Sequence, residues 1–242
     1  MAIVQQFQPD DVFLSATPLF HAASGTRVSS MLVDGQTHVV LGKFTPKSFF
    51  ELVQKYKVTV TVLVPTQLRL IIEDPEFSSY DLSSLRLIVY GAAPSGGELI
   101  RKAQEKFGCG LYQGYGISEC VTNLTGLLPS DHDSALHNRP DLLASCGRVV
   151  PGVRIELRNG QGTPVSVGEV GEIWVQTEKM MTGYWRDPAQ TAEAIVDGWF
   201  RTGDLARSDE DGYLFIVGRS KDMLISGGVN VYPSEIELVL HD

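Results

Sequence analysis

Three short segments of the chain combine small residues with groups that can contact a nucleotide. Residues 91–94 follow an apolar run, and residues 113–119 and 201–204 are predicted as two further glycine-containing loops. Glycine and alanine let the backbone approach a flat ligand closely, and Tyr115 offers an aromatic face for stacking. These segments therefore favour a purine base as the ligand.

Polar groups in and after these segments suit the rest of a nucleotide. Ser118 can donate a hydrogen bond to a phosphate oxygen, and Glu119 is a hard oxygen ligand for magnesium that accompanies phosphates. Asp204 can accept hydrogen bonds from ribose hydroxyls, and Arg219 can donate to phosphate or ribose oxygens. Each segment alone is more typical of an ordinary turn or helix cap. Their order along one chain, followed by residues 218–222 and 227–235, indicates a nucleotide site.

The first half of the chain alternates two kinds of element that would position these residues. Short apolar, β-branched runs predict strands, and they cover residues 12–16, 37–41, 58–64 and 85–90. The stretches between them have apolar residues at helical spacing. This alternation predicts an α/β fold with a mainly parallel sheet and flanking helices, in which ligands bind beyond the carboxyl ends of the strands.

Capping signals place the ends of the predicted helices. Thr45 is predicted to cap a helix that begins at Pro46, and Pro65 is predicted to begin the next one. Ser95 is predicted to cap a third helix, which ends at Gly108.

The second half of the chain has a different pattern, with short alternating runs separated by Gly, Pro and Asp. Residues 153–157, 171–175, 199–201 and 213–217 predict an antiparallel, distorted barrel-like sheet. A hairpin is predicted around Gly227 and Gly228, and a helix from Pro233. We therefore predict an α/β subdomain over residues 1–145, a β-barrel-like subdomain over residues 146–220, and a hinge with the start of a further domain over residues 221–242.

Composition excludes some classes of partner. The chain has 242 residues, 43% of them hydrophobic, and a net charge of -9, which disfavours nucleic acids and anionic membranes. The acidic runs at residues 131–133 and 209–211 are predicted to be solvated turns. No apolar segment is long enough to span a membrane and no secretion signal is evident, so a cytoplasmic location is expected. Cys109, Cys120 and Cys146 lack metal-ligand spacing and are expected to be free thiols.

Together the segments resemble the core motifs of the adenylate-forming, or AMP-binding, superfamily, which includes acyl-CoA synthetases, aryl-CoA ligases, luciferases and peptide-synthetase adenylation domains. The resemblance extends from residues 18–21 to residues 232–237. It implies ATP-dependent activation of a small-molecule carboxylic acid to acyl-AMP, with Mg²⁺, followed by transfer to a thiol. Residues 183–185 and 198–204 favour coenzyme A as the acceptor, although Trp185 and Trp199 are equally well interpreted as packing residues of the sheet.

The resemblance also implies roles for individual residues. Ser118, Glu119 and Arg219 would be catalytic, with Glu119 as the magnesium ligand, and Lys221 would be the hinge between a large and a small domain. His21, Gly227 and Gly228 would lie near the acyl site and the thiol tunnel, although His21 could instead be a satisfied histidine near a helix start. The nucleotide-binding residues would be Gly91, Ala92, Ala93, Gln113, Gly114, Tyr115, Gly116, Asp204, Ile216 and Arg219.

Two elements that the resemblance implies have no counterpart in these 242 residues. They are a Ser/Thr/Gly-rich phosphate loop upstream of His21 and a C-terminal domain with a lysine that stabilises adenylation. We therefore expect impaired activity of this chain on its own. The alternative is a non-catalytic nucleotide- or acyl-binding protein derived from the same family, whereas a nicotinamide oxidoreductase is disfavoured because no Gly-x-Gly-x-x-Gly follows the first strand. Fatty, aryl and alicyclic acids all remain open as substrates, as does the oligomeric state.

Overall fold

The computed structural model describes residue 5 and residues 7–91, 95–226 and 229–231. The chain forms two compact units, which are described in turn. Unit 1 comprises residues Met1–Tyr115 and Leu127–Leu143, and unit 2 comprises Gly116–Gly126 and Ala144–Asp242. The predicted boundaries at residues 145 and 220 stay a prediction.

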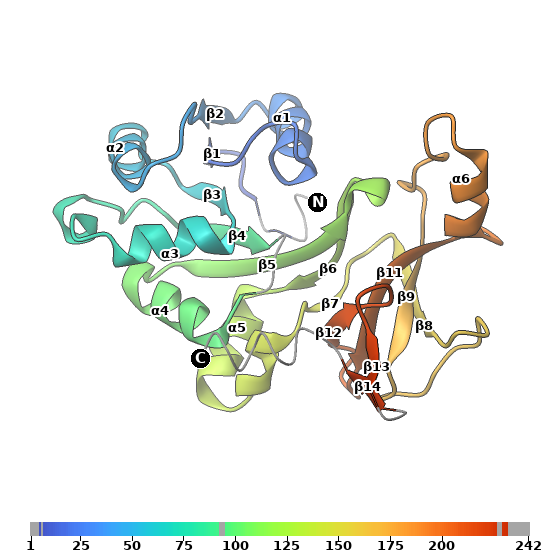
Figure 1. The fold of residues 1–242 in the computed structure, drawn as a ribbon. Helices are drawn as coiled ribbons and strands as arrows, with labels where there is room; N and C mark the ends of the chain where they lie inside the picture. The colour runs from blue at the N-terminus through green and yellow to red at the C-terminus, as the bar shows by residue number, and fades with distance from the viewer. Residues whose placement is uncertain (1–4, 6, 92–94, 227–228, 232–242) are drawn as a thin grey trace. The chain divides into compact units, whose positions relative to one another are not determined.

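Unit 1 is built on parallel strands in the order β2-β1-β3-β4-β5, with helices in the connections (Figure 1). Its elements are β1 Val12–Ser15, α1 Ala22–Asp34, β2 Thr37–Val40, α2 Pro46–Tyr56, β3 Val60–Leu63, α3 Pro65–Glu73, a 3-10 turn Phe77–Ser79, β4 Leu87–Gly91, α4 Gly97–Phe107, β5 Gly110–Ile117 and α5 Pro129–His137. The predicted α/β fold with a mainly parallel sheet is confirmed. Each parallel pair of strands needs a crossover connection, and the helices supply these connections.

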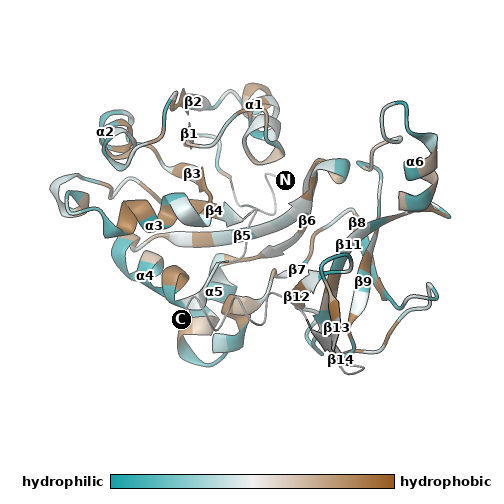
Figure 2. Cartoon of the chain, viewed as in Figure 1, coloured by the Kyte–Doolittle hydropathy of each residue, from teal (hydrophilic) through white to brown (hydrophobic). Residues whose placement is uncertain are grey.

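Alternating strand residues bury both faces of this sheet. One face packs against α2, α3 and α4, where Phe50, Leu68 and Ile100 are fully buried with Leu14, Leu63 and Ile88 of the strands. The other face carries a smaller cluster of Phe13, Val60, Val62, Leu87, Val89 and Tyr112, against Met31 of α1. In Figure 2 apolar residues accordingly appear on β3 and β4 and as bands along α3 and α4. Because both faces of the sheet are buried, polar groups that could bind a ligand are expected at the ends of its strands.

The helix signals were mostly correct. The Thr45 side chain accepts a hydrogen bond from the Ser48 N–H and caps α2, and α3 begins at Pro65. The prediction for Ser95 was wrong, since Gly96 is the N-cap of α4, which ends before Gly108 in the left-handed conformation. Glycine is also accepted at an N-cap, so a serine one residue away did not decide the boundary.

Two further sequence predictions are corrected. Residues 131–133 are not a solvated turn, because they lie in α5 with Asp131 and His132 only 5% and 0% exposed. The Asp131 carboxylate accepts the Leu128 N–H at 2.8 Å and so caps this helix. Residues 113–117 are not a loop but the second half of β5.

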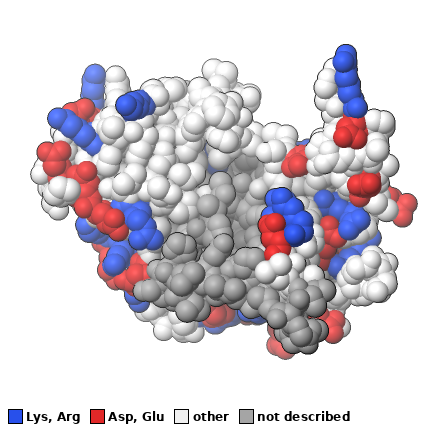
Figure 3. All heavy atoms as spheres, viewed as in Figure 1, with Lys and Arg blue, Asp and Glu red and all other residues white. Residues whose placement is uncertain are grey.

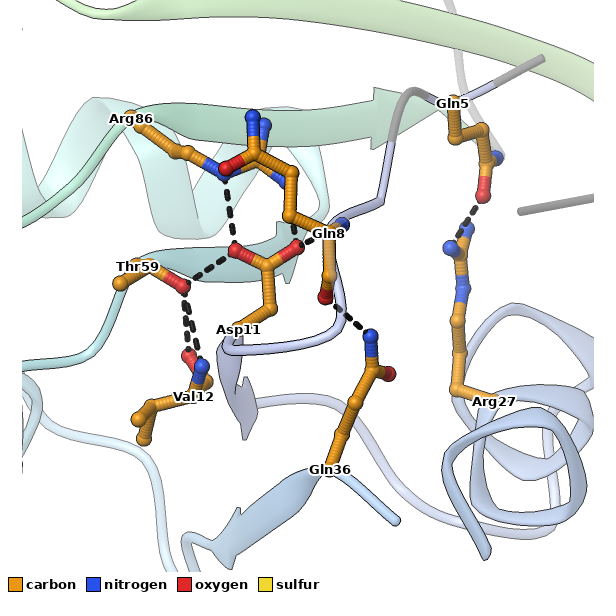
Figure 4. Close-up of polar contacts among 8 residues, drawn as sticks. All are labelled: Gln5, Gln8, Asp11, Val12, Arg27, Gln36, Thr59 and Arg86. Atoms are coloured by element: carbon orange, nitrogen blue, oxygen red, sulfur yellow. Dashed lines mark hydrogen bonds and ion pairs between the residues drawn. The ribbon is translucent and has the colours of Figure 1, made fainter. Parts of the chain in front are cut away.

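A buried carboxylate joins the amino-terminal ends of three neighbouring strands (Figure 4). Asp11, which is 3% exposed, precedes β1 and accepts hydrogen bonds from the side chains of Thr59 and Arg86, which precede β3 and β4. It also accepts the Gln8 N–H at 2.7 Å. Burial would raise the pKa of Asp11, but the bonds from Arg86, Gln8 and Thr59 outweigh it and hold the pKa below its usual value. In the same view Arg27 of α1 bonds to the Gln5 side chain.

Unit 2 is mainly antiparallel, as predicted. Its central sheet has the order β10-β11-β9-β8, with β12 paired to β11. The elements are the 3-10 turn η2 Ser118–Cys120, β6 Thr122–Leu127, the 3-10 turn Pro140–Ala144, β7 Arg148–Val149, β8 Val153–Arg158, β9 Gly171–Thr177, α6 Pro188–Ala194, β10 Ile195–Val196, β11 Trp199–Ser208, β12 Leu214–Arg219, β13 Leu224–Ser226 and β14 Val229–Val231. The unit boundaries fall inside β5, β6 and the 3-10 turn Pro140–Ala144, so these three elements belong partly to each unit.

Packing in unit 2 separates the two tryptophans that were singled out. Trp199 is 9% exposed and lies with Val175 and Phe200 in the sheet, whereas Trp185 is 86% exposed. Residues 201–204, predicted as a loop, are part of β11. The strands β13 and β14 pair with Ser226 opposite Val229, as the predicted hairpin requires, while Gly227, Gly228 and the helix predicted from Pro233 lie outside the described residues.

Charges and thiols complete the description. Basic and acidic side chains are interspersed on the described surface visible in Figure 3. Exposed ion pairs of the chain include Lys57–Asp81 and Arg69–Glu73. Burial raises the pKa of Cys109 to about 12 and that of Cys146 to about 11, and burial with the nearby Glu119 raises that of Cys120 to about 11. All three are free thiols. Within the described part of the chain, no helix has the length and apolar character needed to cross a membrane.

Candidate nucleotide-binding site

The carboxyl edge of the unit 1 sheet carries a close backbone contact between two glycines. Gly91 ends β4 and lies opposite Gly114 of β5. Its φ is +156°, and a Cβ at this position would lie 2.3 Å from the Gly114 carbonyl oxygen. Only glycine fits there without displacing β5. Ala92 and Ala93, the next predicted residues of the adenine wall, lie outside the described residues.

Gln113 lies next to this contact and adjoins a buried hydrogen-bond network. It lies opposite Tyr90 in the pairing of β4 with β5, and Gln113 Oε1 is 3.4 Å from the Tyr90 hydroxyl oxygen. The Tyr90 hydroxyl lies 2.8 Å from His132 Nε2, and His132 Nδ1 lies 2.8 Å from the Leu128 carbonyl oxygen. Burial lowers the pKa of His132 and raises that of Tyr90, so both side chains are neutral near pH 7.

His21 lies at the same edge of unit 1, because it follows β1 and parallel strands end at one edge. It is the N-cap residue of α1 but makes no side-chain capping bond. Its ring is exposed and contacts that of Phe20, with 4.6 Å between the ring centroids. The helix start of the alternative interpretation is therefore present, while the role in an acyl or thiol site stays a prediction.

In unit 2, Ser118 and Glu119 form the turn η2 at the end of β5, and Ser118 is exposed. The Tyr184 hydroxyl donates to Glu119 Oε1 at 3.1 Å, and the Met181 N–H donates to the Glu119 backbone oxygen at 2.7 Å. The pKa of Tyr184 is raised by burial and by the Glu119 carboxylate, so Tyr184 remains a donor. Two contacts from residues 181–184 thus fix the position of Glu119.

The segment that carries Tyr184 is itself tightly held. The Tyr184 N–H donates to the Thr191 hydroxyl at 2.9 Å, and that hydroxyl donates to the Asp187 carbonyl oxygen at 2.7 Å. A Cβ on Gly183 would lie 2.8 Å from the Thr191 methyl group. Gly183 therefore allows the segment to approach α6 closely.

Asp204 and Arg219 face one another across β11 and β12. Arg219 Nε donates to Asp204 Oδ1 at 2.9 Å. The Arg219 side chain is 49% exposed and that of Asp204 is 14% exposed. A second Arg219 nitrogen donates to the Thr202 carbonyl oxygen at 3.3 Å. This pair, which sequence reasoning did not predict, orients the carboxylate from a partly exposed position.

An irregularity in β11 places Asp204. The pairing of β11 with β9 shifts register between Arg201 and Leu205, and Gly203 has a φ of +73°. The Thr202 hydroxyl accepts the Asp204 N–H at 3.0 Å and donates to the Ile173 carbonyl oxygen at 2.9 Å. The Gly203 N–H donates to the Glu172 carboxylate at 3.2 Å. Bulges of this kind re-aim a side chain, and here the re-aimed side chain is Asp204.

The remaining predicted residues of unit 2 follow the same strands. Ile216 lies on β12 and is 38% exposed, Lys221 is exposed in the turn after β12, and Gly116 lies near the end of β5. The structure thus brings Asp204 and Arg219 into contact in unit 2, and Gly91, Gln113 and Gly114 onto neighbouring strands of unit 1. The roles of all these residues in nucleotide binding stay predictions.

The role of Glu119 as a magnesium ligand stays a prediction, and it would need an ion that arrives with its phosphates. No cluster of three or more His, Cys, Asp or Glu side chains that could hold a metal occurs among the described residues. Glu119 offers one carboxylate, of which Oε1 accepts from Tyr184. Magnesium bound to nucleotide phosphates usually keeps several waters and takes one or two protein carboxylates, so a single Glu119 is sufficient.

Sequence reasoning missed Tyr90, His132 and Tyr184 as neighbours of the site. His132 was assigned to a turn, although Pro129, three residues earlier, is a helix-start signal. Its contact with Tyr90 joins residues 42 positions apart, and that between Tyr184 and Glu119 joins residues 65 apart. No local signal in a single sequence predicts such pairs.

Two solved enzymes share this architecture. An amide bond synthetase from Marinactinospora thermotolerans is 37% identical with a TM-score of 0.91, over 99% of this chain and 47% of that chain. The O-succinylbenzoate coenzyme A synthetase from Bacillus subtilis, in complex with ATP and magnesium ion, is 28% identical with a TM-score of 0.88, over 99% of this chain and 48% of that chain.

Curated relatives and a family model agree with this. A medium/long-chain-fatty-acid–CoA ligase of Mycobacterium tuberculosis is 39% identical over 94% of this chain and 39% of the relative. An indoleacetate–CoA ligase of Aromatoleum aromaticum is 37% identical over 98% of this chain and 45% of the relative. The chain thus spans less than half the length of these relatives. A model described as AMP-binding enzyme matches residues 1–185, and the chain belongs to this family.

Proposed function

We propose that this chain forms the nucleotide-binding part of an AMP-forming acyl-CoA ligase, which activates a carboxylic acid with ATP and transfers the acyl group to coenzyme A. The observation that carries the proposal is the Asp204–Arg219 pair on the bulged strand β11. A carboxylate held by one arginine can accept from vicinal ribose hydroxyls, while the arginine can donate to a phosphate or ribose oxygen. Relatives named as a fatty-acid–CoA ligase, an indoleacetate–CoA ligase and a feruloyl-CoA synthase support this class of reaction.

Each proposed residue has a task in the first step. Gly91 and Gly114 let the base lie against backbone, and Tyr115 stacks on it. Ser118 donates to the α-phosphate as the carboxylate attacks, and Arg219 offsets the charge that develops there. Glu119 would hold a magnesium ion, which when bound would neutralise charge on the phosphates. Tyr184 keeps the Glu119 carboxylate in place during this step.

Amide formation is a second candidate, favoured by the 37% identity to the amide bond synthetase. Both reactions would share the acyl-AMP step and differ in the acceptor. Incubating the protein that carries this chain with ATP, magnesium and a panel of fatty and aryl acids, with either coenzyme A or amines, would distinguish them by mass spectrometry of the products. We expect acyl-CoA, and amide without any acyl-CoA would establish the second candidate.

A binding experiment tests the site itself. Calorimetric titration of AMP into the wild type and into Asp204→Asn should give at least about tenfold weaker binding for the variant, because a charge-assisted hydrogen bond contributes about 1.5 to 3 kcal/mol. Glu210→Gln is the matched control, since Glu210 is an exposed carboxylate of the same unit. Equal AMP affinity for wild type and Asp204→Asn would remove Asp204 from the site.

A further inference from the structure

We propose that the buried Tyr90–His132 hydrogen bond fixes the amide of Gln113 with its carbonyl oxygen toward the ligand, and thereby selects a purine that has an exocyclic amine. This inference rests on the proposed nucleotide site, in which Gln113 lies at the edge of the base. Tyr90 and His132 would then be positioning residues that determine base specificity through Gln113.

The direction of the network starts at a backbone carbonyl. The Leu128 oxygen can only accept, so His132 Nδ1, at 2.8 Å from it, carries the hydrogen. The ring is fully buried, with Tyr90 of β4 in T-shaped contact and the acidic Asp131 and Asp133 on its own helix. Because burial keeps the ring neutral, its Nε2 has no hydrogen and can only accept.

The next bond uses the one hydrogen of the tyrosine. Since Nε2 accepts, the Tyr90 hydroxyl donates to it across 2.8 Å. The Tyr90 oxygen can then only accept from other groups. The structure places Gln113 Oε1 3.4 Å from that oxygen, but the two ends of an amide have nearly the same shape, so the bonding pattern decides which end lies there. If the Gln113 side-chain oxygen faced Tyr90, it and the Tyr90 oxygen would both be acceptors, with no hydrogen between them. With its NH₂ group there, Gln113 donates a hydrogen bond.

The orientation of the amide decides which base is accepted. An NH₂ group turned toward Tyr90 leaves the Gln113 carbonyl to face the ligand. Adenine has an amine at position 6 that donates to such an oxygen, whereas guanine has an oxygen there that repels it. A site that presents a fixed acceptor therefore rejects guanine more strongly than a site whose amide can turn over.

Two variants release the amide in different ways. Tyr90→Phe removes only the hydroxyl, so Gln113 has no fixed partner. His132→Phe keeps a buried ring but removes the acceptor, so the Tyr90 hydroxyl is free to donate to the Gln113 carbonyl and reverse the amide. His137→Phe is the control, because the His137 ring also contacts the carbonyl four residues earlier in α5 but is exposed and lies five residues after His132.

The experiment compares AMP and GMP by calorimetry with the full chain. We expect wild type and His137→Phe to prefer AMP, and the ratio of the two affinities to fall at least about tenfold in Tyr90→Phe and His132→Phe. A merely structural role would weaken both nucleotides equally and leave the ratio unchanged, and that outcome would overturn the inference.

The outcomes separate this inference from the function it rests on. Absence of AMP binding by the wild type would overturn the proposed nucleotide site and the inference with it. A wild type that prefers AMP, with the same preference in both variants, would overturn only the role of Tyr90 and His132. If His132→Phe fails to fold, Tyr90→Phe decides alone, since it loses a single oxygen atom.

Discussion

In the unit 1 sheet, the edge where the parallel strands begin (the amino edge) and the edge where they end (the carboxyl edge) treat polar groups in opposite ways. At the amino edge, Asp11 is buried and both of its carboxylate oxygens accept bonds from residues that precede neighbouring strands. At the carboxyl edge, Gly91 and Gly114 bring bare backbone together, and Gln113 is only half buried. One edge saturates its polar groups internally, whereas the other leaves groups available to a ligand.

This difference teaches where to look for function in such a sheet. Buried charge alone does not mark a site, because the Asp11 network is closed and its ions are already paired. Small residues and a half-satisfied amide at the carboxyl ends of strands mark it better. The comparison predicts that changes at the amino edge reduce stability alone, and that changes at the carboxyl edge reduce ligand binding as well.

The largest effect is expected from Asp11→Ala. Removing the carboxylate takes away the buried charge that pairs with Arg86, which is 28% exposed, and the shorter of the two hydrogen bonds that the Thr59 hydroxyl donates, which should lower the free energy of unfolding by about 3 kcal/mol. Urea denaturation measures this, with the exposed neighbour Asp10→Ala as control, which should stay within about 0.5 kcal/mol of wild type. AMP affinity of the folded variant should be unchanged, and a loss of AMP binding would break the comparison.

A smaller loss of stability, together with a loss of binding, is expected from Gly91→Ala. The new methyl group would meet the Gly114 carbonyl and force β5 to shift, at a cost of about 1 to 3 kcal/mol. Because β5 carries Gln113, AMP affinity should fall by about tenfold, which corresponds to about 1.4 kcal/mol. Gly42→Ala, where a Cβ meets nothing within 4 Å, is the control. Unchanged AMP affinity in Gly91→Ala would place the base elsewhere.

The smallest effects are expected from pH, and they separate the two edges. His132 has a lowered pKa in the folded chain, so its contribution is complete above about pH 6.5 and is lost as pH falls toward its folded pKa. Asp11 also has a lowered pKa, so its contribution persists above about pH 3.8 and is lost only below that value. Between pH 7 and 5, the urea midpoint of His132→Phe should therefore change less than that of wild type. Below pH 4, the urea midpoint of Asp11→Asn should change less than that of wild type. The same pH profile in wild type and both variants would contradict this assignment.

Sequence reasoning predicted the elements that local signals specify. Thr45 with Pro46 and the proline at residue 65 begin helices because capping and a fixed φ act within one turn. The alternation of strands and helices was sufficient for the fold class. Residues 113–117 were mistaken for a loop because glycines in a strand look like turn signals, whereas here they allow the close approach of β4 and β5.

The contacts that orient the site could not be predicted in the same way. Asp204 was singled out, but its partner Arg219 depends on the register of β11 and β12, which includes an irregularity between Leu205 and Ala206. Glu119 was singled out too, but its contact with Tyr184 depends on a segment 65 residues later in the chain. Chemistry-bearing residue types can be read from sequence, while the bonds that aim them require the tertiary structure.

The three protonated thiols make the chain a reporter of its own local opening. A thiol with a pKa of about 11 or 12 reacts slowly with a disulfide reagent until its surroundings open and let it ionise. Cys109 belongs to unit 1, and Cys146 to unit 2. The labelling rates of these two positions would thus time the opening of each unit separately, without an introduced probe.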